Sequence, residues 1–225
     1  MSTRLVIDSS SQLKELKDRA TVGKIWAKII SYIFHPIFVP VYIILFLLYV
    51  HPTVFAGFPP GKKILVLLQS LLPYIVLPLV TVLLLKALNF INTIFLTTQR
   101  DRIIPYIACN LWYFWIAYVW YNQPDYPKEL IILAATVFGA SVIGQLANIY
   151  FKISMHAIAM GVMISFMLFL SVTQSTSMGL YLSVALLIAG LVCSARFVAG
   201  NHSQKDVYSG LFAGLAALCV AILFV

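Results

Sequence analysis

The chain has 225 residues, of which 62% are hydrophobic and 10% charged, and its mean hydropathy is +0.97. A domain of this size cannot hide so much apolar surface in one core, so the composition excludes an ordinary soluble protein and predicts an integral membrane protein. The net charge of +8 could indicate nucleic-acid binding, but the basic residues flank apolar stretches. We therefore expect membrane lipids with anionic headgroups as partners, and no nucleic acid.

The first 28 residues are polar and carry both signs of charge. The run Ser9 to Ser11 is suited to cap a short helix, because serine hydroxyls accept the free N–H groups of a first helical turn. We expect residues 1–28 to form an amphipathic helix on the membrane surface or a disordered tail, and we expect no removable signal peptide. Residues 29–225 are then a single transmembrane domain, which carries any catalytic site.

Apolar stretches follow one another from Ile29 to the end of the chain, each near the roughly 20 residues that cross a bilayer as a helix. They predict an all-α fold, a polytopic transmembrane helical bundle with six or seven spans. The expected spans are 29–50, 64–85, 103–121, 130–149, 157–173, 178–197 and 207–225.

Prolines interrupt the first two of these spans. Pro36 and Pro40 are expected to kink the first span or delay its start, because proline lacks a backbone N–H and clashes with the preceding turn. Pro73 and Pro78 are expected to act in the same way in the second span. For His35, which precedes Pro36, we favour a position near the membrane interface over a functional role.

Two patterns bear on how the spans pack. Aromatic residues gather in the third span, and they form either an interfacial belt, which we favour, or a groove for lipid chains. Small residues recur as Gly139-x4-Gly144 and as Gly210-x3-Gly214, which predicts close approach of helices.

The three cysteines lie in or beside apolar segments, so we expect neither a disulfide framework nor a zinc cluster.

A short polar island, residues 194–214, separates the last two spans and holds Arg196, His202 and Asp206. Four residues are about one helical turn, so in a helix that starts near His202 the carboxylate of Asp206 can accept the imidazole N–H. The other ring nitrogen is then free and more nucleophilic. Arg196 offers a fork of donors suited to phosphate oxygens. The spacing indicates phosphoryl transfer, and a polar loop that meets headgroups and water is the alternative.

The island resembles the third signature of the type 2 phosphatidic acid phosphatase superfamily, which reads S-R-x5-H-x3-D. Arg196, His202 and Asp206 fit its spacing, whereas Ala195 separates Ser194 from the arginine. The resemblance covers about a tenth of the chain, and it implies a membrane phosphatase that acts on lipid phosphates without a metal or other cofactor.

The other two signatures of that superfamily are less complete. The second, P-S-G-H, is recognisable at 153–156, where Ser154 and His156 match but the proline and the glycine are absent. The nearest match to the first, K-x6-R-P, is the stretch 100–105, which holds Arg100 and Arg102 but has no lysine at the expected distance.

The resemblance implies a role for each of the matching ionisable residues. His202 attacks phosphorus and forms a phosphohistidine, while Asp206 holds the tautomer of the ring and stabilises its charged form. His156 protonates the leaving oxygen, and water then releases the phosphoryl group.

The same resemblance implies which cationic and polar groups bind the phosphate oxygens. Arg196 and one of Arg100 and Arg102 act as the clamp, and Arg102 is preferred because it precedes Pro105 at a helix entrance. Ser154 adds a donor at the start of the fifth span, and Lys152 takes the place of the missing lysine. Few acidic residues lie near these loops, which argues against a divalent metal ion.

Sidedness follows from the basic residues. If all seven spans cross, the N-terminus and the loops 86–102, 150–156 and 198–206 share one face. Twelve of the fifteen lysines and arginines then lie there, namely Arg4, Lys14, Lys17, Arg19, Lys24, Lys28, Lys86, Arg100, Arg102, Lys152, Arg196 and Lys205. This excess predicts that the N-terminus and the three candidate loops face the cytoplasm.

These patterns predict a metal-independent phosphatase for a lipid phosphate or diphosphate. A phosphotransferase that passes the phosphoryl group to a lipid hydroxyl is the alternative within the same chemistry. From different functional classes, the chain could be a degenerate, non-catalytic membrane protein or a small transporter, although a transporter predicts more ionisable residues inside the spans. The headgroup, the tail and the oligomeric state do not follow from the sequence.

Overall fold

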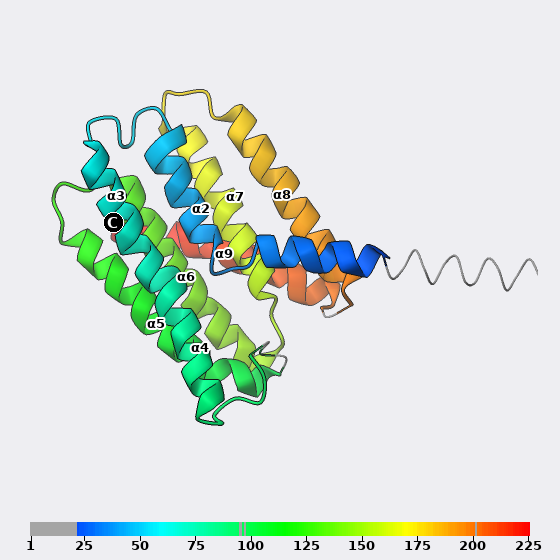
Figure 1. Cartoon of the computed structure of the whole chain (residues 1–225). Coiled ribbons are helices and arrows are strands. Elements are labelled where there is room, and N and C mark those ends of the chain that lie inside the picture. Colours follow the sequence, from blue (N-terminus) through cyan, green and yellow to red (C-terminus); the bar gives the residue numbers. More distant parts are fainter. Residues whose placement is uncertain (1–21, 95, 97, 201) are drawn as a thin grey trace, which may run out of the picture.

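The computed structural model describes residues 22–94, 96, 98–200 and 202–225. In this part of the chain the regular secondary structure is helical, and six helices are long and apolar enough to cross a membrane (Figure 1). These are the continuous helix Pro60–Ala87, α5 (Gln99–Tyr121), α6 (Lys128–Tyr150), α7 (Met155–Thr173), α8 (Gly179–Val198) and α9 (Gln204–Phe224). The predicted all-α membrane bundle is confirmed.

The second span passes through both of its prolines without a break. It consists of α3 (Pro60–Leu71), a π-helical turn (Leu72–Val76) and α4 (Leu77–Ala87). Pro73 lies within the π-helical turn, and Pro78 lies in the first turn of α4. A π-helical turn is one of the usual ways to accommodate a proline inside a helix, because it relieves the clash with the preceding turn.

The first predicted span, 29–50, is not one helix. Residues 22–33 form a first helix, and the chain then turns before α2 (Val39–Leu45) and a π-helical segment (Phe46–Val50). Proline disfavours the helical conformation of the residue before it, which explains the break at His35 and Pro36. Pro40, in the first turn of α2, fits the predicted late start. The span 29–50 is therefore interrupted at Pro36, as expected from its prolines, and its membrane-crossing part begins only at Val39.

The segment after this break nevertheless reaches from one end of α7 to the other. At one end, the rings of His35 and His156 lie with their centroids 5.5 Å apart. At the other, the Thr53 hydroxyl donates to the side chain of Gln174, the residue that caps the C-terminus of α7, at 3.5 Å. The chain therefore changes ends of the bundle between residues 35 and 53.

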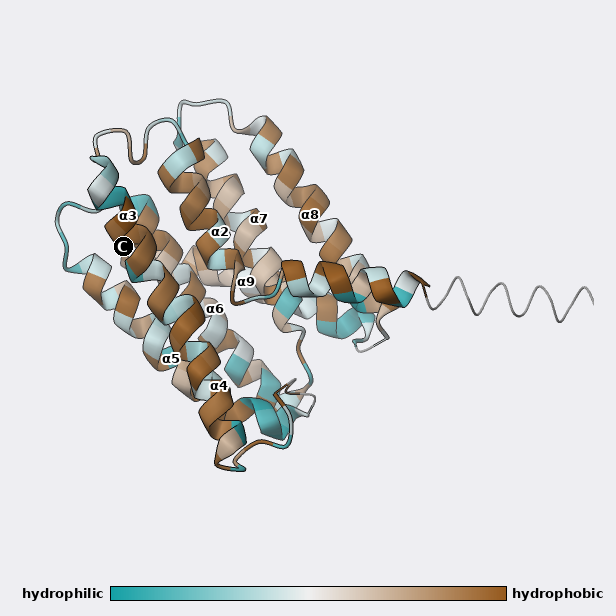
Figure 2. Ribbon diagram, in the orientation of Figure 1, coloured by the Kyte–Doolittle hydropathy of each residue, from teal (hydrophilic) through white to brown (hydrophobic). Residues whose placement is uncertain are grey.

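The helix formed by residues 22–33 runs across the ends of α7 and α8 instead of alongside them (Figure 1). Apolar and polar residues alternate along it (Figure 2), and Trp26, Tyr32, Lys24 and Lys28 are all exposed. This is the pattern of an amphipathic helix that lies in a membrane interface. The predicted helix cap at 9–11 lies outside the described residues.

The close helix approach predicted from the glycines occurs between α7 and α9. A Cβ added to Gly214 would lie 2.5 Å from the carbonyl oxygen of Ile158, and one added to Gly161 would clash with the carbonyl oxygen of Leu211. Gly139, by contrast, has an ordinary contact of 3.8 Å with Ala217. Since the two backbones touch, the first turns of α7 and α9 are held in a fixed relation, and both carry candidate site residues.

The aromatic third span is only partly the belt that we favoured. Trp120 is fully buried, and its indole N–H donates to the Gln69 side chain at 3.2 Å. Trp115 and Tyr121 are exposed, as expected at a lipid boundary. A largely apolar groove of about 460 Å³ lies between α5 and the second span, lined by Gln69, Leu72, Pro73, Leu77, Trp112, Trp115, Ile116 and Val119. Lipid occupancy of this groove stays a prediction.

Candidate active site

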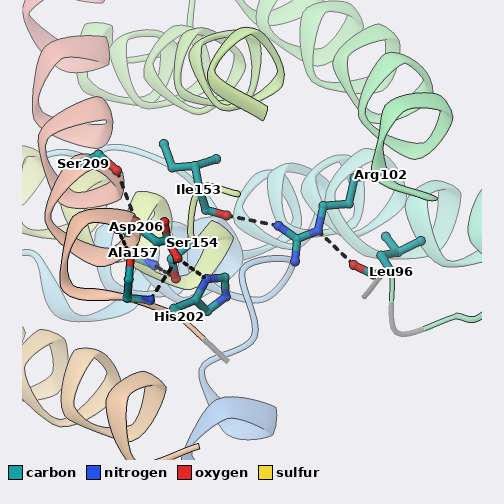
Figure 3. Close-up of polar contacts among 9 residues, drawn as sticks. Leu96, Arg102, Ile153, Ser154, Ala157, His202, Asp206 and Ser209 are labelled. Atoms are coloured by element: carbon teal, nitrogen blue, oxygen red, sulfur yellow. Dashed lines mark hydrogen bonds and ion pairs between the residues drawn. The ribbon is translucent and has the colours of Figure 1, made fainter. Parts of the chain in front are cut away.

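Three polar corners that are far apart in the sequence meet at one end of the bundle, where α5, α7 and α9 begin (Figure 3). Arg102 in the first turn of α5 donates Nη1 to the carbonyl of Ile153, at 3.1 Å. Ser154, directly before α7, donates its backbone N–H to the carbonyl of Asp206 in α9, at 3.1 Å. These two hydrogen bonds tie the three corners together.

Each of the three helices has a side chain that caps its N-terminus. The hydroxyl of Thr98 accepts the N–H of Asp101, that of Ser154 accepts the N–H of Ala157, and Ser203 forms a reciprocal capping box with Asp206. Helix N-termini carry partial positive charge because their first N–H groups lack partners in the helix. Three of them at one end make this region favourable for an anion.

His202 and Asp206 lie close together, but not in the predicted hydrogen bond. The distance between Nδ1 of His202 and Oδ2 of Asp206 is 3.7 Å, and within the described residues Nδ1 is buried without a hydrogen-bond partner. The helix begins at Gln204 and not at His202, and Asp206 Oδ2 accepts the Ser203 N–H at 2.9 Å as part of the cap. The carboxylate of Asp206 therefore acts on His202 only as a nearby negative charge, while its hydrogen bond caps the N-terminus of α9.

The environment of His202 favours a neutral imidazole. Its side chain is 4% exposed. Burial, followed by the nearby cations of Arg196, Arg102 and Lys152, lowers the pKa of His202 to about 4, against the opposing effect of Asp206. At neutral pH the ring therefore has a free nitrogen lone pair, which a nucleophile requires.

Two arginines at this end lack an ionic partner among the described residues. Arg102 is 6% exposed, and it donates Nε to the carbonyl of Leu96 at 2.8 Å in addition to its contact with Ile153. Arg196, in the last turn of α8, donates Nη1 to the hydroxyl of Ser31 at 3.0 Å, and its Nε is buried without a partner among the residues that the structure describes.

The two guanidinium groups lie within electrostatic range of each other. Neither is within 4.0 Å of a carboxylate oxygen in the part of the chain that the structure describes. Carbonyl and hydroxyl oxygens satisfy donors but do not neutralise charge. Buried cations are costly without a counter-charge, so this arrangement favours a bound anion.

The two predicted catalytic histidines share this site. His156, in the first turn of α7, lies within electrostatic range of Arg196, His35 and His202. Its Nε2 is 3.0 Å from the carbonyl oxygen of Ser31. The site thus combines two fixed cations with two imidazoles, and the imidazole of His202 is buried and neutral.

Three predicted phosphate ligands have different surroundings. Lys152 is partly buried and lies within electrostatic range of His202. Arg100 is exposed, and no hydrogen bond or ion pair joins it to the described residues, so of the two arginines in α5 it is Arg102 that reaches the site. Ser154 is fully buried, and its hydroxyl caps α7 instead of facing an open space.

Sequence reasoning missed Ser31 in this region, and it gave His35 an interfacial position instead of a functional role. The ring of His35 packs edge-on against that of His156, with an interplanar angle of 82°. Burial and the nearby Arg196 lower the pKa of His35. The histidine next to Pro36 was a usable signal for a break in the helix, but nothing marked Ser31, because its role depends on contacts with α7 and α8.

Among the described residues, no group of three or more histidine, cysteine, aspartate or glutamate side chains is placed to hold a metal ion.

The chain matches no family model, no curated protein and no solved structure. What the site can do is therefore argued from its own geometry.

Proposed function

We propose that the protein is a membrane-embedded phosphatase that hydrolyses a lipid phosphate or diphosphate through a phosphohistidine. The observation that carries this proposal is a pair of arginines, Arg102 and Arg196, that lie beside the buried neutral His202 and have no carboxylate within ion-pair distance in the described residues. The spacing of Arg196, His202 and Asp206, which resembles the third signature of the type 2 phosphatidic acid phosphatases, supports the same reaction.

Phosphate binding is the task of the cations. Arg102 and Arg196 hold the phosphoryl oxygens between them, and Lys152 adds charge at the edge of the site. Positioned cations of this kind stabilise the charge that develops on the oxygens during phosphoryl transfer.

His202 supplies the nucleophile. Its Nδ1 faces Asp206, so Nε2 is the nitrogen that attacks phosphorus. The new P–N bond forms as the bond between phosphorus and the leaving oxygen breaks, and the ring becomes positively charged. Asp206 stabilises that charge across the 3.7 Å that separates it from Nδ1, because opposite charges attract strongly at this range in a site of low dielectric constant.

His156 transfers a proton to the leaving oxygen and later accepts one from water. The ring is neutral in the free protein; it takes up a proton from solution at Nδ1 when the phosphate anion binds, and it gives that proton to the leaving oxygen, which becomes an alcohol or a phosphate. A water molecule then attacks the phosphohistidine, loses a proton to His156, and breaks the P–N bond. When free phosphate leaves, His156 returns the proton to solution and both histidines are neutral again, so atoms and charges balance over the cycle.

The surroundings of the site support a lipid as the substrate. The cations lie at the ends of apolar helices, where a headgroup can enter while its tails stay in the bilayer. Phosphatidate, phosphatidylglycerophosphate and polyprenyl diphosphate are candidates of this type. The excess of basic residues at this end favours a cytoplasmic orientation.

The experiment is phosphate release by purified protein from a panel of these lipids, with a chelator present. We expect His202→Ala to lower the rate by at least about 10³-fold, because the covalent route is lost. His51→Asn, at the other end of the bundle, is the matched control, since the asparagine oxygen can replace Nδ1 as acceptor for the N–H groups of Thr53 and Val54. Equal rates for the wild type and His202→Ala would refute the proposal.

A second measurement distinguishes hydrolysis from transfer to a lipid hydroxyl. The protein is incubated with radiolabelled substrate and an alcohol, and the label is followed into free phosphate, into the alcohol and into acid-labile, alkali-stable protein phosphate. We expect free phosphate as the product and labelled protein only when His202 is intact. Label that moves mainly into the alcohol would favour the phosphotransferase.

A further inference from the structure

The helix of residues 22–33 ends next to the site, and Ser31 lies in its last turn. Ser31 is 8% exposed. Its carbonyl oxygen lies 3.0 Å from Nε2 of His156, and its hydroxyl oxygen lies 3.0 Å from Nη1 of Arg196. One residue thus contacts a candidate proton carrier and a candidate phosphate ligand, which belong to different helices.

The carbonyl of Ser31 is available because of Pro36. In a continuing helix it would accept the N–H of His35, four residues later. Pro36 keeps His35 out of the helical conformation, and the helical hydrogen bonds end at Phe34, whose N–H donates to Ile30 at 2.9 Å. The next carbonyl along the chain, that of Ser31, has His156 as its partner instead.

This contact determines the tautomer of His156. A carbonyl oxygen only accepts hydrogen bonds, so the nitrogen that faces it must carry a proton. Nε2 of His156 is therefore the N–H nitrogen, and Nδ1 is the nitrogen that can take up or release a second proton.

The hydroxyl of Ser31 has two partners of opposite kind. It donates its proton to the carbonyl of Ala27 at 2.7 Å, and its oxygen accepts from Arg196. With its donor direction used inside its own helix, the hydroxyl oxygen presents a lone pair to the guanidinium. This holds Arg196 in place without neutralising its charge.

We propose that Ser31 is a positioning residue of the site: its carbonyl, released by the break at Pro36, holds His156 as the Nε2–H tautomer, and its hydroxyl orients Arg196 for the phosphate. The mechanistic meaning rests on the proposed phosphatase, in which Nδ1 of His156 is then the atom that exchanges the proton. The tautomer and the orientation of the arginine can be tested without turnover.

The first test is nitrogen NMR of the full chain labelled with ¹⁵N-histidine. The chain has four histidines, so each signal can be assigned by replacing one at a time. We expect His156 to be in the Nε2–H form at neutral pH. In Pro36→Ala the helix can continue and recapture the Ser31 carbonyl, so His156 should become a mixture of tautomers. Pro40→Ala, in the first turn of α2, is the control and should leave the tautomer unchanged.

The second test is binding of orthovanadate, a phosphate analogue, to the purified protein. Ser31→Ala keeps the carbonyl and should keep the tautomer, but we expect vanadate affinity to fall about tenfold, because Arg196 loses a charge-assisted hydrogen bond. Ser31→Thr, which restores a hydroxyl, should recover most of that affinity.

The outcomes separate this inference from the proposed function. A mixed or Nδ1–H form of His156 in the wild type overturns the role of the carbonyl, and unchanged vanadate affinity in Ser31→Ala overturns that of the hydroxyl, even if lipid phosphates are hydrolysed. If no lipid phosphate is hydrolysed while both results are as expected, the phosphatase proposal fails and the positioning role of Ser31 stands.

Discussion

The charged side chains at the two ends of the bundle have different partners. At the end opposite the site, Lys62 pairs with Asp125 at 2.9 Å, and Glu129 accepts a hydrogen bond from Gln174 at 2.7 Å. At the site end, Arg102 and Arg196 lie near each other without a carboxylate within ion-pair distance in the described residues. One end thus pairs a cation with a carboxylate, whereas the other leaves two cations without such a partner among the described residues.

The histidines follow the same division. His51, at the opposite end, is 5% exposed, and its Nδ1 accepts the N–H groups of Thr53 and Val54, so it stabilises the turn after α2. The side chain of His202 is also buried, but its Nδ1 has no such partner among the described residues. Each ring has one buried nitrogen without a partner among the described residues, Nε2 in His51 and Nδ1 in His202. The difference is that the other nitrogen of His51 accepts two backbone N–H groups, which gives this histidine a structural role.

The sharpest test of the difference between the ends replaces each of two arginines that lie two residues apart. Arg102→Ala removes a buried cation from the site, and we expect kcat to fall by about 10² to 10³, the usual effect of losing one group that stabilises developing charge. Arg100→Ala removes an exposed cation, and it should change kcat less than about twofold because the site keeps all of its charges. Circular dichroism of both variants controls for folding, and equal losses would remove Arg102 from the mechanism.

A packing variant tests whether the relation between α7 and α9 holds the site end together. Gly161→Ala places a methyl group against the carbonyl of Leu211, and overpacking of this kind destabilises by about 1 to 3 kcal/mol. Gly139→Ala meets only an ordinary contact and should be close to neutral. The measurement is thermal unfolding in detergent, and similar melting temperatures for the two variants would contradict the close approach.

Acid should affect the site end through His202. Because its pKa is lowered from 6.5 to about 4, the folded protein keeps the ring neutral where the unfolded chain binds a proton. The contribution of His202 to stability is therefore constant above about pH 6.5 and falls as the pH drops from 6.5 to 4.

The corresponding effect on activity appears at lower pH. Below about pH 4 the nucleophile becomes protonated, so we expect the rate to fall about tenfold per pH unit there. Phosphate release measured from acid to neutral pH, with unfolding followed in parallel, reports both effects. An acid limb of the rate near pH 6.5, the ordinary pKa of histidine, in fully folded protein would show that the ring is not shielded.

The smallest effect is expected at the opposite end. Asp125→Asn removes the ion pair between Asp125, whose side chain is 70% exposed, and Lys62, whose side chain is 35% exposed. Exposed pairs contribute about 0.2 to 1 kcal/mol, and salt screens them. We expect a small loss of thermal stability that disappears at high salt and no change in phosphate release. A large loss of activity would mean that the two ends are coupled.

Much of the candidate site could be predicted from the sequence because its residues flank apolar spans. Successive membrane-spanning segments cross in alternating directions, so every second loop lies on the same face. Counting the spans therefore placed Arg102, His156 and His202 on one face. Individual contacts were less predictable. Whether Asp206 bonds to His202 or to the Ser203 N–H depends on the residue at which α9 begins, and helix boundaries are uncertain by a turn or so from sequence.

The first span shows the other limit of sequence reasoning. Pro36 marked a break in the chain, but not the direction of the helix before it or the partner of the carbonyl that it leaves free. Both depend on the faces that α7 and α8 offer, which no local pattern encodes.

The sequence by itself determined that this is a helical membrane protein, and it placed most of the helices to within about a turn. It also determined which polar corners share an end of the bundle. Both results depend only on the length of each apolar segment and on the number of segments between two loops. The tertiary structure decided that Arg102 and not Arg100 reaches the site, that Asp206 caps a helix, and that Ser31 contacts both His156 and Arg196. The contacts of Ser31 join residues more than a hundred positions apart, and such contacts depend on helix rotation, which is set only when the helices pack.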